Sequence, residues 1–188
     1  MQTNLVWHYT TGEKFLRIAE SGMLLPTGIG VTPPEKPVLW FSRHQFFEPT
    51  AVKAVMERGR PRRCGIAEMR ELGGGLVRFG YAQELLHGDS ALRAVAKISR
   101  AVWRRLQKEA RVQGGNPADW FGTLESLHIA DLVIDVMDDT MNWVTMTTPL
   151  LMGAKRPMPH ERPRPVNRVH IDHTLTSSKH NDAEVHGE

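Results

Sequence analysis

The stretch LVWHYTTGEKFLRIAESG, residues 5–22, changes from strand-like to helix-like patterning within a few residues. Its first half is rich in aromatic and β-branched residues and favours a strand over residues 5–10. In its second half the apolar residues recur at helical spacing, with Thr11 as a suitable N-cap and Gly22 as a C-cap. We therefore expect a strand that leads directly into a helix.

The same periodicity arguments extend to the rest of the chain. A Gly/Pro-rich loop at residues 27–36 precedes an almost wholly apolar strand. The clearest helix is amphipathic and runs from Ser90 to Val112. Further strands are predicted at 37–42, 76–80, 132–137 and 141–146, a helix at 48–57, a strand or a helix at 65–69, a turn or short strand at 118–123, and a hairpin turn at 138–140.

Length and composition bound the organisation of the chain. Its 188 residues predict one α+β domain over residues 1–150, followed by a Pro-, His- and charge-rich disordered tail over residues 151–188. The single cysteine, Cys64, cannot form an intramolecular disulfide or a cysteine-based zinc site. We expect no membrane span, no signal peptide, no metal site and a cytoplasmic location.

Positive charge is concentrated in two segments, although the net charge is only +3. Arginines cluster between residues 58 and 63, and a second basic set runs from Arg93 to Arg111. In the predicted helix, Arg93, Lys97, Arg100 and Arg104 fall at three- and four-residue steps on one face. Such a stripe can follow a DNA or RNA backbone, and the alternative interpretation is an ordinary solvated helix face.

Two short segments carry the residues best suited to chemistry, since the chain contains no phosphate-binding loop, dinucleotide fingerprint or nucleophile elbow. The first is His8-Tyr9-Thr10, at a strand end beside a helix N-terminus, where hydrogen-bonding groups suit phosphate or ribose. The second is Ser42 at the end of the apolar strand, near Phe46 and Phe47. A strand-end histidine that satisfies a backbone carbonyl, and aromatics that belong to the core, are the structural alternatives.

The order of these parts resembles the start of the ADP-ribosyltransferase superfamily, which includes DNA-targeting toxins and RNA 2'-phosphotransferases. The shared features are His-Tyr-Thr on the first strand, a helix that ends in glycine, a Gly/Pro loop, and an apolar strand that ends in serine. The resemblance implies a split mixed or antiparallel sheet with flanking helices. It also implies NAD as substrate, with His8, Tyr9, Thr10 and Ser42 in the NAD site.

Two carboxylates are candidates for the catalytic acid that the resemblance implies. The segment Ala118-Asp119-Trp120-Phe121 is similar to the toxins' Ala-Glu-aromatic sequence, with the shorter aspartate in place of glutamate. Glu125 is the nearest alternative carboxylate. Either would stabilise the oxocarbenium-like ribose as nicotinamide leaves. Arg78 is a candidate partner of the NAD pyrophosphate, and its alternative role is that of a surface arginine.

Three functions follow, in order of preference. The first is an ADP-ribosyltransferase-like enzyme that acts on a nucleic acid or protein acceptor, as a toxin or a phage-related effector. The second is a non-catalytic module that binds a nucleotide in the same site. The third is a nucleic-acid-binding protein that uses the basic helix 90–112. An antitoxin partner is a further hypothesis that no residue in the sequence supports.

Overall fold

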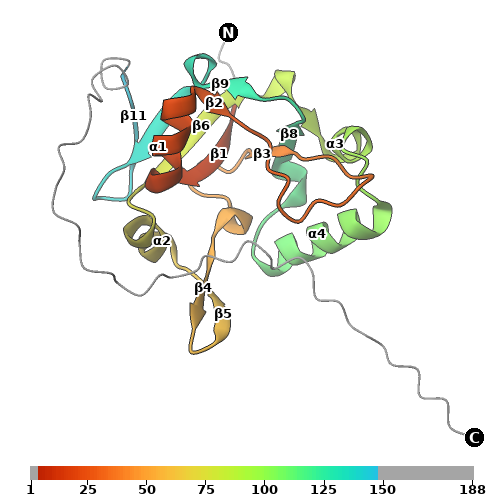
Figure 1. The fold of residues 1–188 in the computed structure, drawn as a ribbon, viewed down its shortest axis with the longest axis horizontal. Helices are drawn as coiled ribbons and strands as arrows, with labels where there is room; N and C mark the ends of the chain where they lie inside the picture. Colours follow the sequence, from red (N-terminus) through yellow and green to blue (C-terminus); the bar gives the residue numbers. More distant parts are fainter. Residues whose placement is uncertain (1–3, 148–188) are drawn as a thin grey trace, which may run out of the picture.

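A seven-stranded antiparallel sheet organises residues 4–147, the part of the chain that the computed structural model describes (Figure 1). The strand order is β11-β10-β6-β1-β3-β8-β7. The predicted α+β class, with an antiparallel sheet and flanking helices, is confirmed. The strands of this sheet are β1 (Leu5–Thr11), β3 (Leu39–Ser42), β6 (Leu76–Ala82), β7 (His87–Gly88), β8 (Trp120–Thr123), β10 (Val133–Met137) and β11 (Trp143–Thr145).

Helices and two small antiparallel pairs complete the described part of the chain. The short pairs are β2 (Met23–Leu24) with β9 (Leu127–His128), and β4 (Ala54–Glu57) with β5 (Arg60–Arg63). The α-helices are α1 (Gly12–Ser21), α2 (Ile66–Leu72), α3 (Asp89–Val95) and α4 (Arg100–Val112), and single 3-10 turns are η1 (Pro49–Ala51), η2 (Gln83–Leu85), η3 (Pro117–Asp119) and η4 (Ile129–Asp131).

The strand-to-helix transition predicted for residues 5–22 is confirmed in β1 and α1. Thr11 is extended at the N-cap position of α1. Gly22 ends the helix with φ of 70°, a left-handed conformation that glycine adopts without the steric cost of a Cβ. The Thr11 side chain makes no capping hydrogen bond, and the first amides of α1 instead donate to the carbonyls of Gly75 and Gly73.

Each face of the sheet buries its own apolar cluster. One face, which we call the α1 face, packs Val6, Phe41 and Phe79 beneath Phe15 and Ile18 of α1. The other, called here the opposite face, packs Trp7, Tyr9, Phe47, Met69 and Met137. A third cluster lies beneath α3 and α4 and contains Val38, Leu92, Trp103, Ala110 and Trp120. Alternation along β1 therefore sends neighbouring residues into different environments.

Two predicted elements between residues 48 and 69 are wrong. The expected helix at 48–57 is η1 followed by β4, whose chain turns at Arg58-Gly59 and returns as β5. Both turn residues have positive φ, 50° and 77°, as the tight turn of a two-residue hairpin requires. The strand offered for 65–69 is also wrong, and its helical alternative is correct, as α2.

The single helix predicted for Ser90–Val112 is wrong as well, because the chain forms two helices there. α3 ends at Val95, and Lys97 adopts a positive φ of 54°. Ser99 then caps α4, its hydroxyl accepting a hydrogen bond from the Val102 amide at 3.2 Å. The basic residues of this region therefore do not share one continuous helix face.

Other predictions at the C-terminal side are confirmed within the described residues. β10 and β11 form the expected hairpin, with Met137 paired to Trp143. The Asp138 carboxylate accepts bonds from the Asn142 amide and from the hydroxyl and amide of Thr140, which lower the pKa of this carboxyl. Between residues 4 and 147, none of the helices has the length and apolar character needed to cross a bilayer. The predicted tail at 151–188, and the last three residues of the predicted domain, lie outside the described residues.

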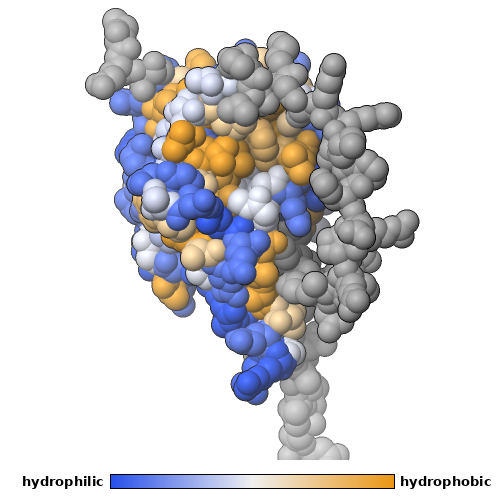
Figure 2. Space-filling model, turned by 90° about the vertical axis from the view of Figure 1, so that its left-hand side faces the viewer, coloured by the Kyte–Doolittle hydropathy of each residue, from blue (hydrophilic) through white to orange (hydrophobic). Residues whose placement is uncertain are grey.

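The surface that carries α1 and β11 is divided into two zones (Figure 2). Hydrophobic side chains gather on its upper part, and Leu16 of α1 and Val144 of β11 are among the exposed apolar residues. Its lower end is strongly hydrophilic, where the β4–β5 hairpin extends below the sheet (Figures 1 and 2). The hairpin is therefore a polar projection from the body of the fold.

Candidate functional site

His8 lies where β1 and β3 separate. The two strands share a single register pair, Trp7 with Ser42, while β1 pairs with β6 along its whole length. The His8 Nδ1 lies 2.9 Å from the Trp40 carbonyl oxygen of β3. The imidazole is therefore hydrogen-bonded to a β3 carbonyl beyond the last β1–β3 register pair. This bond links the two strands at the point where they separate.

The surroundings of His8 determine its tautomer and charge. A carbonyl oxygen only accepts, so Nδ1 carries the proton and Nε2 is left as an acceptor. The ring lies edge-on to Phe41, with centroids 5.9 Å apart, and 6.3 Å from Phe79. Burial chiefly, and the positive charges of Lys53 and Lys14, lower the pKa of His8 to about 4 against the opposing hydrogen bond to Trp40. At neutral pH His8 is an uncharged acceptor.

Two lysines from different elements act on His8. Lys14 is in the first turn of α1, and Lys53 immediately precedes β4. Burial and the charge of Lys14 lower the pKa of Lys53 to about 8. Burial, and then the charge of Arg17, also lower the pKa of Lys14. Within residues 4–147, neither amine forms an ion pair with a carboxylate. We call His8, Lys14 and Lys53 the basic cluster.

Thr10 lies on the α1 face with His8, two residues further along β1. Its side chain is buried. The first amides of α1 are already engaged, since Gly12 and Glu13 donate to the carbonyls of Gly75 and Gly73. Anion binding at this end of α1 would therefore depend on the lysine side chains more than on helix amides.

Tyr9 and Ser42 point to the opposite face, away from His8. The Tyr9 hydroxyl donates to the His44 carbonyl, and burial raises its pKa. The Ser42 hydroxyl donates to Glu48 at 2.6 Å and accepts from the His44 amide at 3.1 Å. Both side chains fix the segment that follows β3, so the structure does not bring them together with His8.

Arg78 is buried on the opposite face, so the surface-arginine alternative is wrong. Its guanidinium forms an ion pair with Asp135 at 2.7 Å and also donates to the Gln45 carbonyl. It lies over the rings of Trp7 and Trp143, 3.7 and 4.6 Å from their centroids. The Asp135 carboxylate accepts a further bond from Thr145 at 2.8 Å. Every polar group of this ion pair is partnered within the protein.

The two predicted catalytic carboxylates lie on either side of β8. Asp119 precedes it and contacts Arg43 at 3.6 Å and the Asn116 amide at 3.1 Å. Glu125 follows it and is exposed. Among the described residues, no side-chain hydrogen bond or ion pair joins Asp119 or Glu125 to His8, Lys14 or Lys53.

The predicted basic stripe is divided between α3, α4 and the turn that joins them. Arg93 donates to the Ile98 carbonyl at 3.3 Å, and Lys97 is exposed in the turn. Arg100 and Arg104 are exposed on α4, together with Arg105, Lys108 and Arg111. The exposed basic surface therefore belongs to α4.

Sequence reasoning missed two features of the site. Nothing in the sequence indicated that Lys53 belongs to the site, because it lies in a segment predicted to be helical. Its charge acts on His8 only because the fold brings distant segments of the chain together. Glu48 is buried, and its carboxylate accepts from Ser42, from the Thr50 hydroxyl at 2.8 Å and from the Trp120 indole at 3.4 Å. The signal for Glu48 was local: an acid directly before Pro49-Thr50 is a typical helix-start pattern, and Glu48 caps η1.

Comparisons with protein-family models, curated proteins and solved structures find no match to this chain. Over residues 4–147, no group of three or more His, Cys, Asp or Glu side chains is arranged to hold a metal ion. The candidate site is therefore interpreted from its own geometry and electrostatics.

Proposed function

We propose that the protein binds a phosphate-bearing nucleotide of the NAD class at the basic cluster. The observation that carries this proposal is the position of His8, which bonds to the Trp40 carbonyl where β1 and β3 separate and keeps Nε2 as an acceptor. The charges of Lys14 and Lys53 act on this imidazole, and neither amine is paired with a carboxylate in the described part of the chain. Partly buried cations without a counter-ion are costly, and an anionic ligand would supply the missing charge.

The groups of the site suit the two polar parts of a nucleotide. The free Nε2 of His8 can accept a hydrogen bond from a ribose hydroxyl, and the two amines can donate to phosphate oxygens. The Thr10 hydroxyl is a further donor on the same face. Binding of a phosphate would raise the pKa of Lys53 from about 8, because an opposite charge favours the ammonium form.

ADP-ribosyl transfer from the bound NAD to a nucleic acid or protein is the second candidate function. It is favoured by the position of Asp119, held by Arg43 and Asn116 beside β3, the strand whose Trp40 carbonyl holds His8. Transfer requires a carboxylate near the ribose C1' as the bond to nicotinamide breaks. Asp119 would have to approach the basic cluster when ligand binds, and Glu125 is the alternative.

Calorimetric titration with NAD and with ADP-ribose tests the binding proposal. His8→Asn is the most informative variant, because the Asn amide can still donate to the Trp40 carbonyl but has no group in place of Nε2. We expect binding by the native protein and at least tenfold weaker binding by His8→Asn and by Lys53→Met. Unchanged affinity in both variants would exclude the basic cluster as the site.

Release of nicotinamide from NAD tests the second candidate separately. Native protein is incubated with NAD, with and without single-stranded DNA or RNA, beside Asp119→Asn and Glu125→Gln. Turnover that one of these variants abolishes, while NAD affinity is retained, would identify the acid. Binding without turnover would leave the protein as a nucleotide-binding module.

A further inference from the structure

We infer that α4 and the β4–β5 hairpin together form a docking surface for a DNA duplex, with α4 against the phosphate backbone and the hairpin in the major groove. The inference goes beyond nucleotide binding and does not depend on the basic cluster. It rests on where the structure places two sets of cations that are separate in the sequence.

The first set lines the solvent side of α4. Val102, Trp103, Leu106 and Ala110 face the protein, which leaves five cations outside: Arg100, Arg104, Arg105, Lys108 and Arg111. Glu109 is the one acid in the helix, and it lies 4.0 Å from Arg105. In the described part of the chain no other ion pair involves α4.

The length of this row suits a phosphate backbone. From Arg100 to Arg111 the helix axis advances about 16 Å, at about 1.5 Å per residue. One strand of a duplex advances about 3.4 Å along its axis per phosphate while it winds around that axis, so a straight row of this length can face some of the phosphates in its span. The length of the cation row on α4 therefore suits contact with a short stretch of phosphate backbone.

The second set is at the end of the β4–β5 hairpin. Arg62 is engaged by Glu57 and Glu68, and Arg63 donates to the Pro49 carbonyl. Arg58 and Arg60, in and beside the tight turn, form no ion pair among the described residues. All four residues of β5 are exposed. A two-stranded ribbon of this kind has the width that the major groove, about 12 Å wide, accepts.

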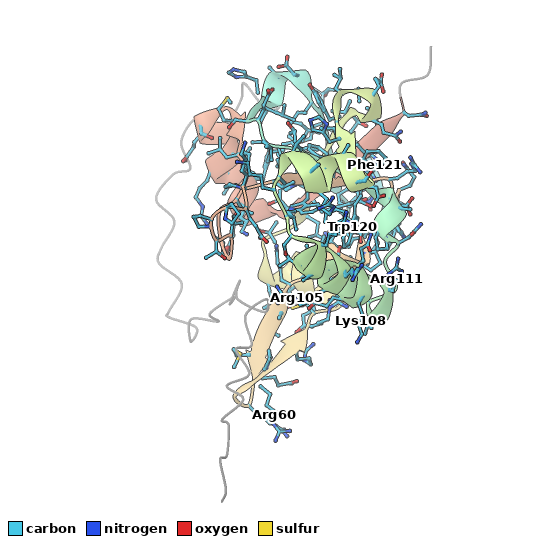
Figure 3. All side chains as sticks on the ribbon, turned by 90° about the vertical axis from the view of Figure 1, so that its right-hand side faces the viewer. Arg60, Arg105, Lys108, Arg111, Trp120 and Phe121 are labelled. Atoms are coloured by element: carbon cyan, nitrogen blue, oxygen red, sulfur yellow. The ribbon has the colours of Figure 1, made fainter. Side chains whose placement is uncertain are left out.

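The two sets meet on one part of the molecule. Arg63, at the base of the hairpin, contacts Pro49 of η1. Gly115, just beyond α4, abuts the same turn: a Cβ at Gly115 would lie 3.3 Å from the Thr50 methyl carbon. Figure 3 shows Arg105, Lys108 and Arg111 along α4 and Arg60 at the free end of the hairpin, all in the lower half of the molecule. A single duplex could therefore contact both elements.

The arrangement of cations on α4 and the hairpin fits a DNA duplex better than it fits an acidic protein. The cations form a linear row plus a narrow projection, which matches a regular backbone beside a groove. An RNA duplex has a deep and narrow major groove that the ribbon cannot enter. We therefore expect DNA duplex to bind more tightly than RNA duplex, and both more tightly than a flexible polyanion such as polyglutamate.

Fluorescence anisotropy with a labelled 24-base-pair DNA duplex, measured over a range of salt concentrations, tests the inference in the full chain. The α4 variant is Arg104→Gln with Lys108→Gln and Arg111→Gln. The hairpin variant is Arg58→Asn with Arg60→Gln, in which Asn-Gly preserves the tight turn. The control with the same charge change as the hairpin variant is Arg17→Gln with Lys36→Gln, whose residues are exposed and lie outside both elements.

We expect the α4 variant to bind at least tenfold more weakly, with the slope of log K against log salt reduced by about 2 to 3, because each lost phosphate contact contributes about 0.9. The hairpin variant should lose the preference for DNA over RNA duplex, and the control should lose neither property. Equal effects of all three variants, or equal binding of polyglutamate and DNA, would overturn the inference.

His8→Asn should bind the duplex normally, so a failure of the nucleotide site remains distinguishable from a failure of this surface.

Discussion

His8 and Tyr9 are neighbours on β1, yet they belong to two charged regions whose polar groups are satisfied differently. On the opposite face, Tyr9 lies beside Arg78, whose guanidinium is paired with Asp135, bonded to Gln45 and covered by two indole rings. At the point where β1 and β3 separate, His8 is acted on by the like charges of Lys14 and Lys53, which have no carboxylate partner in the described part of the chain. A buried charge that is fully partnered therefore leaves nothing for a ligand to satisfy, whereas a partly buried charge without a counter-ion is suited to a ligand.

Breaking the ion pair between Arg78 and Asp135 should reduce the stability of the fold more than any other change considered below. Asp135→Leu would leave the Arg78 guanidinium buried without its counter-charge, which costs about 3 to 5 kcal/mol of unfolding free energy. Urea unfolding measures the loss. Adding Arg78→Met to Asp135→Leu should restore much of it, because an apolar pair replaces the ion pair. A double variant as unstable as Asp135→Leu would contradict the view that this region acts as one charge-balanced unit.

The next largest effect should be a loss of stability at acidic pH, caused by protonation of His8 in the basic cluster. The folded protein holds the pKa of His8 near 4, below its ordinary value of 6.5, so the unfolded chain binds more protons between these values. Stability contributed by the neutral imidazole is present above pH 6.5 and is lost as the pH falls toward 4, by on the order of 3 kcal/mol. His8→Asn keeps a donor to Trp40 and should flatten this part of the pH profile. An unchanged profile would place the titrating group elsewhere.

Lys53→Met separates stability from binding. Because burial lowers the pKa of Lys53 to about 8 from 10.5, the charged amine opposes folding at neutral pH. Its removal should raise the unfolding free energy by about 1 to 2 kcal/mol, a value reduced for solvent screening, while nucleotide binding weakens. Thermal unfolding with and without NAD measures both. A destabilised Lys53→Met variant would show that the amine is a structural group.

The parts of the fold that sequence predicted are those controlled by nearby residues. The patterns that predict β1, α1 and the β10–β11 hairpin lie within single segments: strand composition, helical spacing that ends at Gly22, and the turn at 138–140. The helix expected at 48–57 failed because β4 exists only through its pairing with β5. The long helix is interrupted because Lys97 adopts a positive φ and Ser99 caps a new helix, although the apolar spacing continues across the break.

The candidate site shows the same division between local and distant information. His8 and Thr10 were selected as residues near the end of a predicted strand, whereas His8 is the middle residue of β1 and Thr10 lies two residues later on the same face. Ser42 and His8 point to different faces because of the register pair between Trp7 and Ser42, which no local pattern contains. Lys53 is far from His8 in the sequence, so its charge acts on the imidazole only in the folded chain. A sequence therefore identifies candidate groups more readily than it identifies which of them meet.

The change with the smallest expected effect is at Ser42. This residue was predicted to bind NAD, but its hydroxyl is hydrogen-bonded to Glu48 and to the His44 amide on the opposite face of the sheet. Its hydroxyl donates to the buried Glu48 carboxylate, which keeps bonds from Thr50 and Trp120 when Ser42 is changed to Ala. The loss of one of several bonds to this carboxylate should cost about 1 kcal/mol in urea unfolding. NAD affinity, measured by calorimetry, should remain within twofold of the native value, because Ser42 and His8 lie on different faces of the sheet. A Ser42→Ala variant of normal stability that binds NAD tenfold more weakly would reverse this assignment, because Ser42 would then belong to the ligand site. The contrast between the region around the Arg78–Asp135 ion pair and the basic cluster would then no longer separate structural groups from ligand-binding groups.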